Sequence, residues 1–275
     1  MHALQEQIIA EMGVKPRIDP AQEVVDRVRF LADYALSARA KGFVLGISGG
    51  VDSTLGGRLT QMAAELLRSE GHEATFIAVR LPHGVQADEA DASAAMDFVA
   101  ADVEHTVNIE PGTSALVEAI DAASGRELSD FDRGNVKARL RMTVQYAIAG
   151  DRDLLVIGTD QAAESVSGFF TKFGDGGADV LPLFGLNKRQ VRQLLQHLDA
   201  PEPLWAKVPT ADLLDDKPLQ TDEAELGIAY DTIDDYLECR EVPQDAADLI
   251  ERRYLATRHK RTTPASILDD WWREG

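Results

Sequence analysis

A short glycine-rich segment near the start of the chain joins two runs of very different periodicity. Gly46-Ile-Ser-Gly-Gly-Val-Asp-Ser53 ends the apolar run Phe43–Ile47 and opens Ser53–Leu67, whose apolar residues recur at helical spacing. Glycines at 46, 49 and 50 allow positive φ and a close approach of a ligand to the backbone. Successive N–H groups in such a turn, with the N-terminus of the next helix, form an anion site. The segment therefore predicts a strand–turn–helix unit that binds phosphate.

Other known loops compete for this segment. The P-loop pattern is excluded because no lysine follows the glycines, and the dinucleotide pattern G-x-G-x-x-G is absent. The nucleophile elbow is matched literally by Gly46-Ile-Ser48-Gly-Gly50, and it would require His197 or His259 as a base. A plain glycine turn, with Ser53 capping the helix, is a third interpretation. The anion loop is favoured because it gives Asp52 a purpose, as a ligand of a divalent metal that bridges to the phosphates.

The rest of the chain alternates short apolar runs with helical periodicity, which is typical of βαβ units. We predict an α/β fold, a doubly wound, mostly parallel and Rossmann-like sheet flanked by helices. A single domain covers 1–275, with a nucleotide-binding sheet (20–165), a glycine-rich substrate loop (166–185) and a mostly helical C-terminal part (186–275). The expected strands are 43–47, 75–79, 105–109 and 153–157, and the expected helices are 22–40, 53–67, 87–100, 134–149, 187–198, 222–238 and 244–259.

Composition narrows the class of function. The net charge of -19 argues against nucleic acid as a partner, because phosphate contacts along a strand require clustered Lys and Arg. Cys239 is the sole cysteine, which excludes an intrachain disulfide. The chain has no apolar run of about 18 residues and its first residues lack a signal-peptide pattern. We therefore expect a cytoplasmic protein without a membrane segment.

Several polar residues fall where ligands of α/β sheets bind. Arg80 ends the second strand, and Thr159 and Glu164 follow the fourth, at the same sheet edge as the loop. Glu164 could share a Mg²⁺ ion with Asp52, or could be a first-turn carboxylate favoured by the helix dipole. Lys172 lies between two phenylalanines in a glycine-rich stretch, which suits a flat ligand that carries phosphate.

Two levels of family resemblance add to this picture. Ser48-Gly-Gly-Val-Asp-Ser53 resembles the loop of the N-type ATP pyrophosphatases, whose adenine-nucleotide α-hydrolase fold cleaves ATP to AMP and pyrophosphate. Further segments, in order and spacing, resemble the NAD synthetases over nearly the whole chain; His83 departs from a tyrosine common there. These segments are Val79–Gln86, Gly134–Met142, Gly158–Glu164, Gly168–Asp179, Leu181–Leu183 with Lys188-Arg189, and His259–Arg261.

The resemblance implies a role for each matching residue. Asp52 and Glu164 would hold Mg²⁺, and Asp52, Asp179 and Lys188 would be catalytic, with Asp179 orienting or deprotonating ammonium. Without the resemblance, Asp179 would be a helix cap, Arg139 a solvated arginine and His259 a cation on the helix dipole. The implied ATP contacts are Gly46, Ile47, Ser48, Gly49, Gly50, Val51, Asp52, Ser53, Arg80, Gln86, Thr159, Lys188 and Thr210; the implied deamido-NAD contacts are Arg139, Phe170, Lys172, Asp179, His259 and Lys260.

The implied reaction has two steps. The nicotinate carboxylate of deamido-NAD attacks the α-phosphorus of ATP and releases pyrophosphate, and ammonia then displaces AMP to form the amide of NAD. Ammonia is the expected donor because Cys239 lies in a helical stretch without a nearby histidine, unlike a glutaminase nucleophile. The resemblance also suggests a homodimer. The rivals are a tRNA-modifying relative, which would need a basic surface and more cysteines, and a nucleotide sensor without turnover.

Overall fold

Four parallel strands form the centre of the molecule. The computed structural model describes residues 3–84, 89–209 and 220–273. The strands are β1 (Gly42–Gly46), β2 (Thr75–Arg80), β3 (Val103–Thr106) and β4 (Leu155–Val156), in the order β3-β2-β1-β4. Because β2 and β4 flank β1 on opposite sides, the strand order reverses there, and a crevice is expected at the carboxyl ends of β1 and β4. The predicted doubly wound parallel sheet is confirmed.

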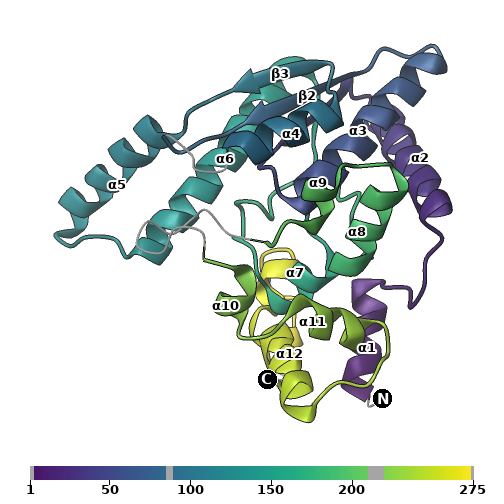
Figure 1. Ribbon diagram of the computed structural model, residues 1–275. Coiled ribbons are helices and arrows are strands. Elements are labelled where there is room, and N and C mark those ends of the chain that lie inside the picture. The colour runs from purple at the N-terminus through teal and green to yellow at the C-terminus, as the bar shows by residue number, and fades with distance from the viewer. Residues whose placement is uncertain (1–2, 85–88, 210–219, 274–275) are drawn as a thin grey trace.

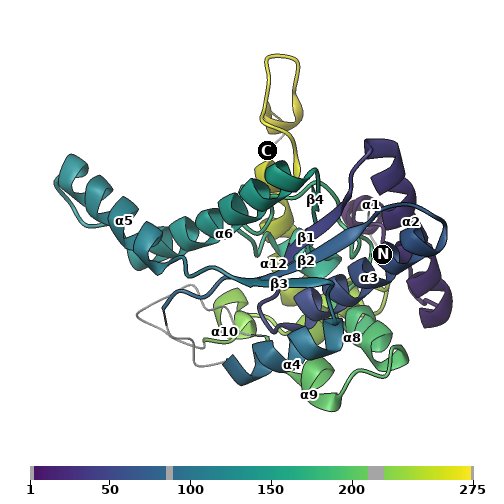
Figure 2. The ribbon, with the colours of Figure 1, turned by 90° about the horizontal axis from the view of Figure 1, so that it is seen from above.

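Both faces of the sheet are covered because its strands are apolar on both sides. Phe43 and Leu45 point into the larger core, while Val44 points into a smaller one. The larger core lies under α2 (Pro20–Ala38), α3 (Val51–Ser69), α4 (Glu89–Val99) and α8 (Lys188–His197). The opposite face is covered by α6 (Asp130–Arg152), which Figure 2 shows on the far side of the sheet from α3 and α4.

Two predicted strands are shifted or shortened. The third spans 103–106 instead of 105–109, because the Asn108 side chain accepts hydrogen bonds from the N–H groups of Gly84 and Glu110 and turns the chain into the next helix. The fourth is reduced to Leu155–Val156, because Asp153 takes a left-handed φ of 57° to end α6 and Ile157 forms an isolated bridge with Val180.

Several helix boundaries also differ from those expected. Helix α6 starts at Asp130 rather than 134, with Ser129 as its cap. The predicted helix 222–238 is two helices, α10 (Asp222–Leu226) and α11 (Tyr230–Leu237), separated at Gly227 with φ 70°. Residues 244–259 likewise divide into α12 (Gln244–Ala256) and α13 (Arg258–Arg261). The elements without a prediction are α1 (Ala3–Met12), α5 (Glu110–Ser124), α7 (Ala162–Ser167), α9 (Glu202–Ala206) and the 3₁₀ turn η1 (Trp271–Arg273).

A helical layer packs below the sheet and has a core of its own. Figure 1 shows α1, α11 and α12 in this layer, at the end of the molecule where both termini lie. Its core joins Ile8 of α1, Val166 of α7, Ile233 of α11 and Tyr254 of α12. Helix α8 contacts α3 on one side and α11 on the other, so it connects the layer to the sheet. The predicted division of the chain into 20–165, 166–185 and 186–275 stays a prediction.

None of the helices within the described residues is both long and apolar enough to cross a membrane.

Candidate active site

A cavity of about 540 Å³ lies at the carboxyl edge of β1 and β4. Its walls are the glycine-rich loop, the segment after β4, one face of α6, and the loop that follows α7. The structure thus brings together predicted residues that are far apart in sequence. Those that line the cavity are Gly46, Ile47, Ser48, Gly50, Val51, Asp52, Ser53, Thr159, Glu164, Phe170, Lys188 and Lys260.

The glycine-rich loop leaves the N-terminus of α3 open. Gly50 caps α3 without a side-chain hydrogen bond, so the first N–H groups of the helix are available to an anion. Ser53 does not cap α3, because its hydroxyl donates to the Gly50 carbonyl and lies 3.0 Å from the Ser48 hydroxyl. Within the described residues, Ser48 is thus paired with Ser53 and the Gly50 N–H rather than with a histidine. The cap and nucleophile-elbow interpretations are both wrong.

One lysine holds two of the predicted carboxylates together. The Lys188 ammonium lies 2.5 Å from Asp52 Oδ2 and 3.1 Å from Glu164 Oε1. Asp52 comes from the first turn of α3, Glu164 from α7, and Lys188 is the first residue of α8. The Lys188 side chain is 2% exposed, and its ammonium lies 4.8 Å from the centre of the Tyr230 ring. Tyr230 donates in turn to Asp222, which also lines the cavity.

Desolvation dominates the electrostatics of this cluster. It raises the pKa of Glu164 well above the usual range, and the Asp52 charge adds to the shift while Lys188 opposes it. Desolvation also raises the pKa of the neighbouring Asp160 to about 7. For Lys188 desolvation acts in the other direction, yet the charges of Asp52 and Glu164 outweigh it and raise the pKa of the ammonium. Two carboxylates face a single ammonium, so a further cation would favour the ionised form of Glu164.

The donor set fits a metal that arrives with a phosphate ligand. Asp52 Oδ1 is buried and has no hydrogen-bond partner among the described residues. In the same residues, no three His, Cys, Asp or Glu side chains converge to hold a metal. Asp52 and Glu164 alone would leave most of an octahedral Mg²⁺ shell to phosphate oxygens and water, which is the usual arrangement for this ion.

The predicted deamido-NAD contacts form a chain of interactions beside the cavity. The Arg139 guanidinium donates to the Lys172 carbonyl at 3.4 Å, and the Lys172 ammonium donates to the His259 carbonyl at 2.6 Å. Lys260 donates to the carbonyls of Gly168 and Phe170 at 2.9 Å, and its ammonium lies 5.5 Å from the centre of the Phe170 ring. Of these residues, Arg139, Lys172 and His259 do not line the cavity.

Three further predicted residues also lie away from the cavity wall. Arg80 forms a two-pronged ion pair with Glu89, at 3.0 and 2.9 Å. Asp179 accepts the Val156 N–H at 2.8 Å and the Tyr146 hydroxyl at 3.1 Å, and no helix follows it directly, so the helix-cap alternative is wrong. Gly49 packs its backbone against α4. The predicted contacts Gln86 and Thr210 lie outside the described residues.

Sequence reasoning missed a face of α6 that lines the cavity. Gln145 accepts the Gly46 N–H at 2.7 Å, and Arg141 donates to the Leu81 carbonyl at 3.0 Å, so both fix the walls. Asn135 accepts a hydrogen bond from Thr171 in the loop after α7. Asn135, Ala138, Met142 and Gln145 recur every three or four residues, a spacing that places them on one helix face.

Comparisons with known proteins agree with this architecture. A sequence model of the NAD synthase family matches residues 23–264. The NH(3)-dependent NAD(+) synthetase of Bacillus velezensis is 59% identical over 271 residues, which cover 98% of this chain and 100% of the relative. The enzyme of the same name from Nocardia farcinica is 60% identical over 274 residues, 99% of this chain and 100% of the relative. The chain belongs to the NAD synthase family.

Solved structures support the same assignment. The NAD+ synthetase from Burkholderia pseudomallei superposes with a TM-score of 0.82 at 50% identity, covering 94% of this chain and 96% of that one. The NMN synthetase from Francisella tularensis has a TM-score of 0.79 at 34% identity and covers 92% and 100%. Membership of the NAD synthase family confirms the resemblance predicted from the sequence and removes the tRNA-modifying alternative.

Proposed function

We propose that this chain catalyses the ATP-dependent amidation of deamido-NAD with ammonia, giving NAD, AMP and pyrophosphate through an adenylated intermediate. The observation that carries this proposal is the cluster of Asp52, Glu164 and Lys188 beside a glycine-rich loop whose helix N-terminus is open. Such a site suits the triphosphate of ATP. The full-length relatives at about 60% identity support the choice of deamido-NAD and ammonia as the other substrates.

On the ATP side, the protein binds the phosphates and neutralises their charge. The N–H groups of the loop and of the first turn of α3 would face the phosphates, and Lys188 is a buried cation in the same cavity wall. Asp52 and Glu164 would hold Mg²⁺, which would supply positive charge to the leaving pyrophosphate. ATP contacts by Arg80, Gln86, Thr159 and Thr210 are part of the same proposal.

On the deamido-NAD side, the group of Arg139, Lys172, His259 and Lys260 would bind the dinucleotide, with Phe170 as a flat surface. Desolvation lowers the pKa of His259, and the nearby positive charges lower it further. Neutral histidine suits stacking and hydrogen bonding rather than charge neutralisation. Asp179 would orient or deprotonate the ammonium ion, and its two hydrogen bonds hold the carboxylate in place.

The decisive experiment measures pyrophosphate release from ATP in the presence of Mg²⁺ and ammonium chloride. We expect release to require deamido-NAD, and NAD to form in equal amount. Nicotinate mononucleotide is the matched control, because one structural neighbour is an NMN synthetase. Faster turnover of the mononucleotide would overturn the substrate assignment, and no release with either substrate would favour a nucleotide sensor.

The two substrate sites can be separated by one substitution. Lys172→Ala removes the ammonium that bonds to the His259 carbonyl, so we expect the KM for deamido-NAD to rise by about 10-fold and the KM for ATP to stay within about 2-fold, since tenfold corresponds to about 1.4 kcal/mol. Initial rates with each substrate varied in turn test this. Lys41→Ala, in an exposed ion pair with Asp153, is the control. A larger rise in the KM for ATP than in the KM for deamido-NAD would mean that the loop after α7 binds ATP instead.

We also propose a homodimer and a cytoplasmic location. Helix α5 buries only Thr113 among its residues and packs against α6, as Figures 1 and 2 show, so the pair extends from the body with apolar side chains exposed. Leu116 of α5 and Phe131 of α6 are 43% and 62% exposed. A second copy covering this arm would bury them.

A further inference from the structure

One helix of the C-terminal layer contacts Lys188 at both ends. Tyr230 of α11 places its ring 4.8 Å from the ammonium. Asp234, four residues later, accepts hydrogen bonds from the backbone N–H of Lys188 at 3.2 Å and of Arg189 at 2.7 Å. Residues four apart on a helix lie on the same face. A single turn of α11 therefore meets both the main chain and the side-chain tip of this lysine.

Asp234 adds to a capping box that α8 already has. Asn187 accepts the Gln190 N–H at 2.9 Å, and Gln190 accepts the Asn187 N–H at 3.2 Å, so α8 has its own capping box. The capping box leaves the N–H groups of Lys188 and Arg189 unpaired, and Asp234 takes both. Asp234 is 1% exposed, and desolvation raises its pKa to about 7. Burying the Asp234 carboxylate costs free energy of solvation, so we infer that this side chain does more than cap α8.

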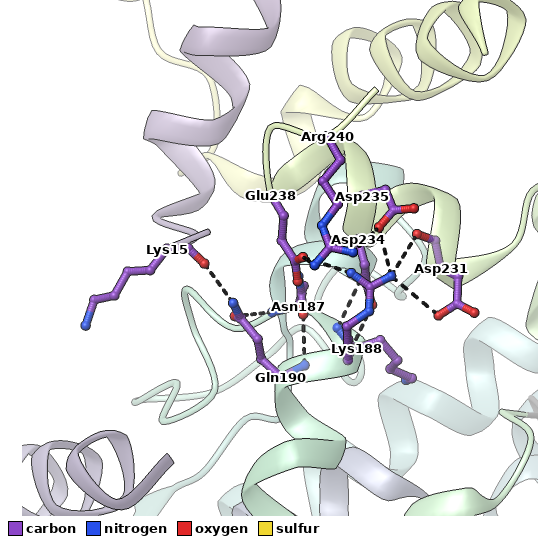
Figure 3. A network of polar contacts seen from close by, with 10 residues as sticks. Lys15, Asn187, Lys188, Gln190, Asp231, Asp234, Asp235, Glu238 and Arg240 are labelled. Atoms are coloured by element: carbon purple, nitrogen blue, oxygen red, sulfur yellow. Dashed lines mark hydrogen bonds and ion pairs between the residues drawn. The ribbon is translucent and has the colours of Figure 1, made fainter. Parts of the chain in front are cut away.

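A second layer of contacts holds α11 against α8. Glu238 accepts hydrogen bonds from Asn187 at 2.8 Å and from Arg189 at 2.8 Å, and Arg189 also bonds to Asp235 at 2.9 Å. Figure 3 shows these side chains of α11 gathered around the first turn of α8. The two helices are thus joined by charged groups at the residues that surround Lys188.

We propose that Asp234, together with Tyr230, is a positioning residue that aims the Lys188 ammonium at Asp52, Glu164 and the phosphates of ATP. This inference rests on the proposed role of Lys188 as the cation at the phosphates. A lysine side chain loses rotamer entropy when it is fixed. The contacts of Asp234 with the main chain of Lys188 and of Tyr230 with its ammonium offset that loss before ATP binds. The helical layer thus sets the geometry of the cation together with Asp52 and Glu164.

The first test compares two neighbouring aspartates. Asp234→Asn keeps the size of the side chain but removes the charge that faces the Lys188 and Arg189 N–H groups. We expect kcat to fall by about 10-fold, or about 1.4 kcal/mol, with the KM for deamido-NAD within about 2-fold. Asp235→Asn is the matched control, because Asp235 bonds to the side chains of Arg189 and Arg240. Equal losses in the two variants would overturn the proposal.

The second test is a double-mutant cycle with Lys188→Ala, measured on kcat and on ATP affinity by calorimetry. If Asp234 acts through Lys188, Asp234→Asn has less than about a 2-fold effect once Lys188 is alanine, whereas a merely structural role gives additive losses. Additive losses overturn the inference. Should Asp234→Asn fail to fold, the same cycle is run with Tyr230→Leu, and additivity there is equally decisive. Because ATP affinity is measured without deamido-NAD, the cycle separates this inference from the proposed amidation.

Discussion

Charge balance at single residues defines the candidate site. Asp52 and Glu164 share the single ammonium of Lys188, and Asp52 keeps one buried oxygen without a hydrogen-bond partner among the described residues. Placing unlike charges so close in a poorly solvated pocket makes each of them sensitive to loss of the others. Substitutions here should therefore affect chemistry far more than packing.

Asp52→Asn tests the metal role most directly. The amide is a much weaker cation ligand, so we expect kcat to fall by about 100-fold or more, the range found when a charge-stabilising group is removed. Asparagine keeps the shape of the side chain, which lies in the cavity wall, so the variant should stay folded. Glu65→Gln, on the exposed side of the same helix, is the control for α3. Near-normal turnover of Asp52→Asn would refute the metal role.

Asp160 should make stability depend on pH. Desolvation raises its folded pKa to about 7 from 3.8, so between these values the folded protein holds a proton that the unfolded chain releases. Its stabilising contribution is therefore lost as pH rises through about 7, with a slope of at most about 1.4 kcal/mol per pH unit. Asp160→Asn should flatten the dependence of the urea-unfolding free energy on pH between about pH 4 and 7. Parallel curves for wild type and variant would contradict the shift, and Asp33→Asn serves as the exposed control.

Contacts between elements decide how the glycine-rich loop Gly46–Ser53 is held. Gly49 has φ 82°, and a Cβ atom there would lie 2.8 Å from the Ala92 backbone of α4. The loop therefore rests directly on α4, although the two are far apart along the chain. Helix α5 shows the opposite case, since it buries a single residue, Thr113, and contributes almost nothing to the cores.

Gly49→Ala and Gly71→Ala form a matched pair. Both glycines have left-handed φ, 82° and 88°, but a Cβ on Gly71 meets nothing within 4 Å. We expect Gly71→Ala to cost about 1–2 kcal/mol from backbone strain, and Gly49→Ala to cost about 1–3 kcal/mol more because α4 must move. Urea unfolding and ATP calorimetry check this, with ATP affinity reduced in Gly49→Ala alone. Equal losses of stability in Gly49→Ala and Gly71→Ala would mean that α4 moves away from the new Cβ atom at little cost in free energy.

At the scale of the whole molecule, the exposed arm of α5 and α6 predicts assembly. We expect sedimentation equilibrium to give twice the chain mass of 30.0 kDa. Leu116→Glu places a charge on the arm and should shift the molecule toward monomer. Leu255→Glu, on the exposed face of α12, should leave the mass unchanged. A monomer in the wild type, or the same mass in both variants, would contradict an interface on the arm.

Local patterns determined a large part of this protein. The phosphate loop, the alternation of strands and helices, and the family resemblance all depend on residues close together in sequence, where periodicity and motif spacing act. The predicted ends of the strands were less accurate. The Asn108 hydrogen bonds end β3 early, and the left-handed Asp153 delays the start of β4. Roles assigned by resemblance to Arg139, Lys172 and Asp179 stay predictions.

The tertiary structure decided how the charged groups meet. Lys188 and Asp52 are 136 residues apart, and their contact exists because α8 packs between the sheet and the helical layer. The support of Lys188 by Tyr230 and Asp234 depends on the same packing and has no local signature. Spacing along a chain can encode one helix face or one turn, but the distance between two helices is set by the cores that hold them.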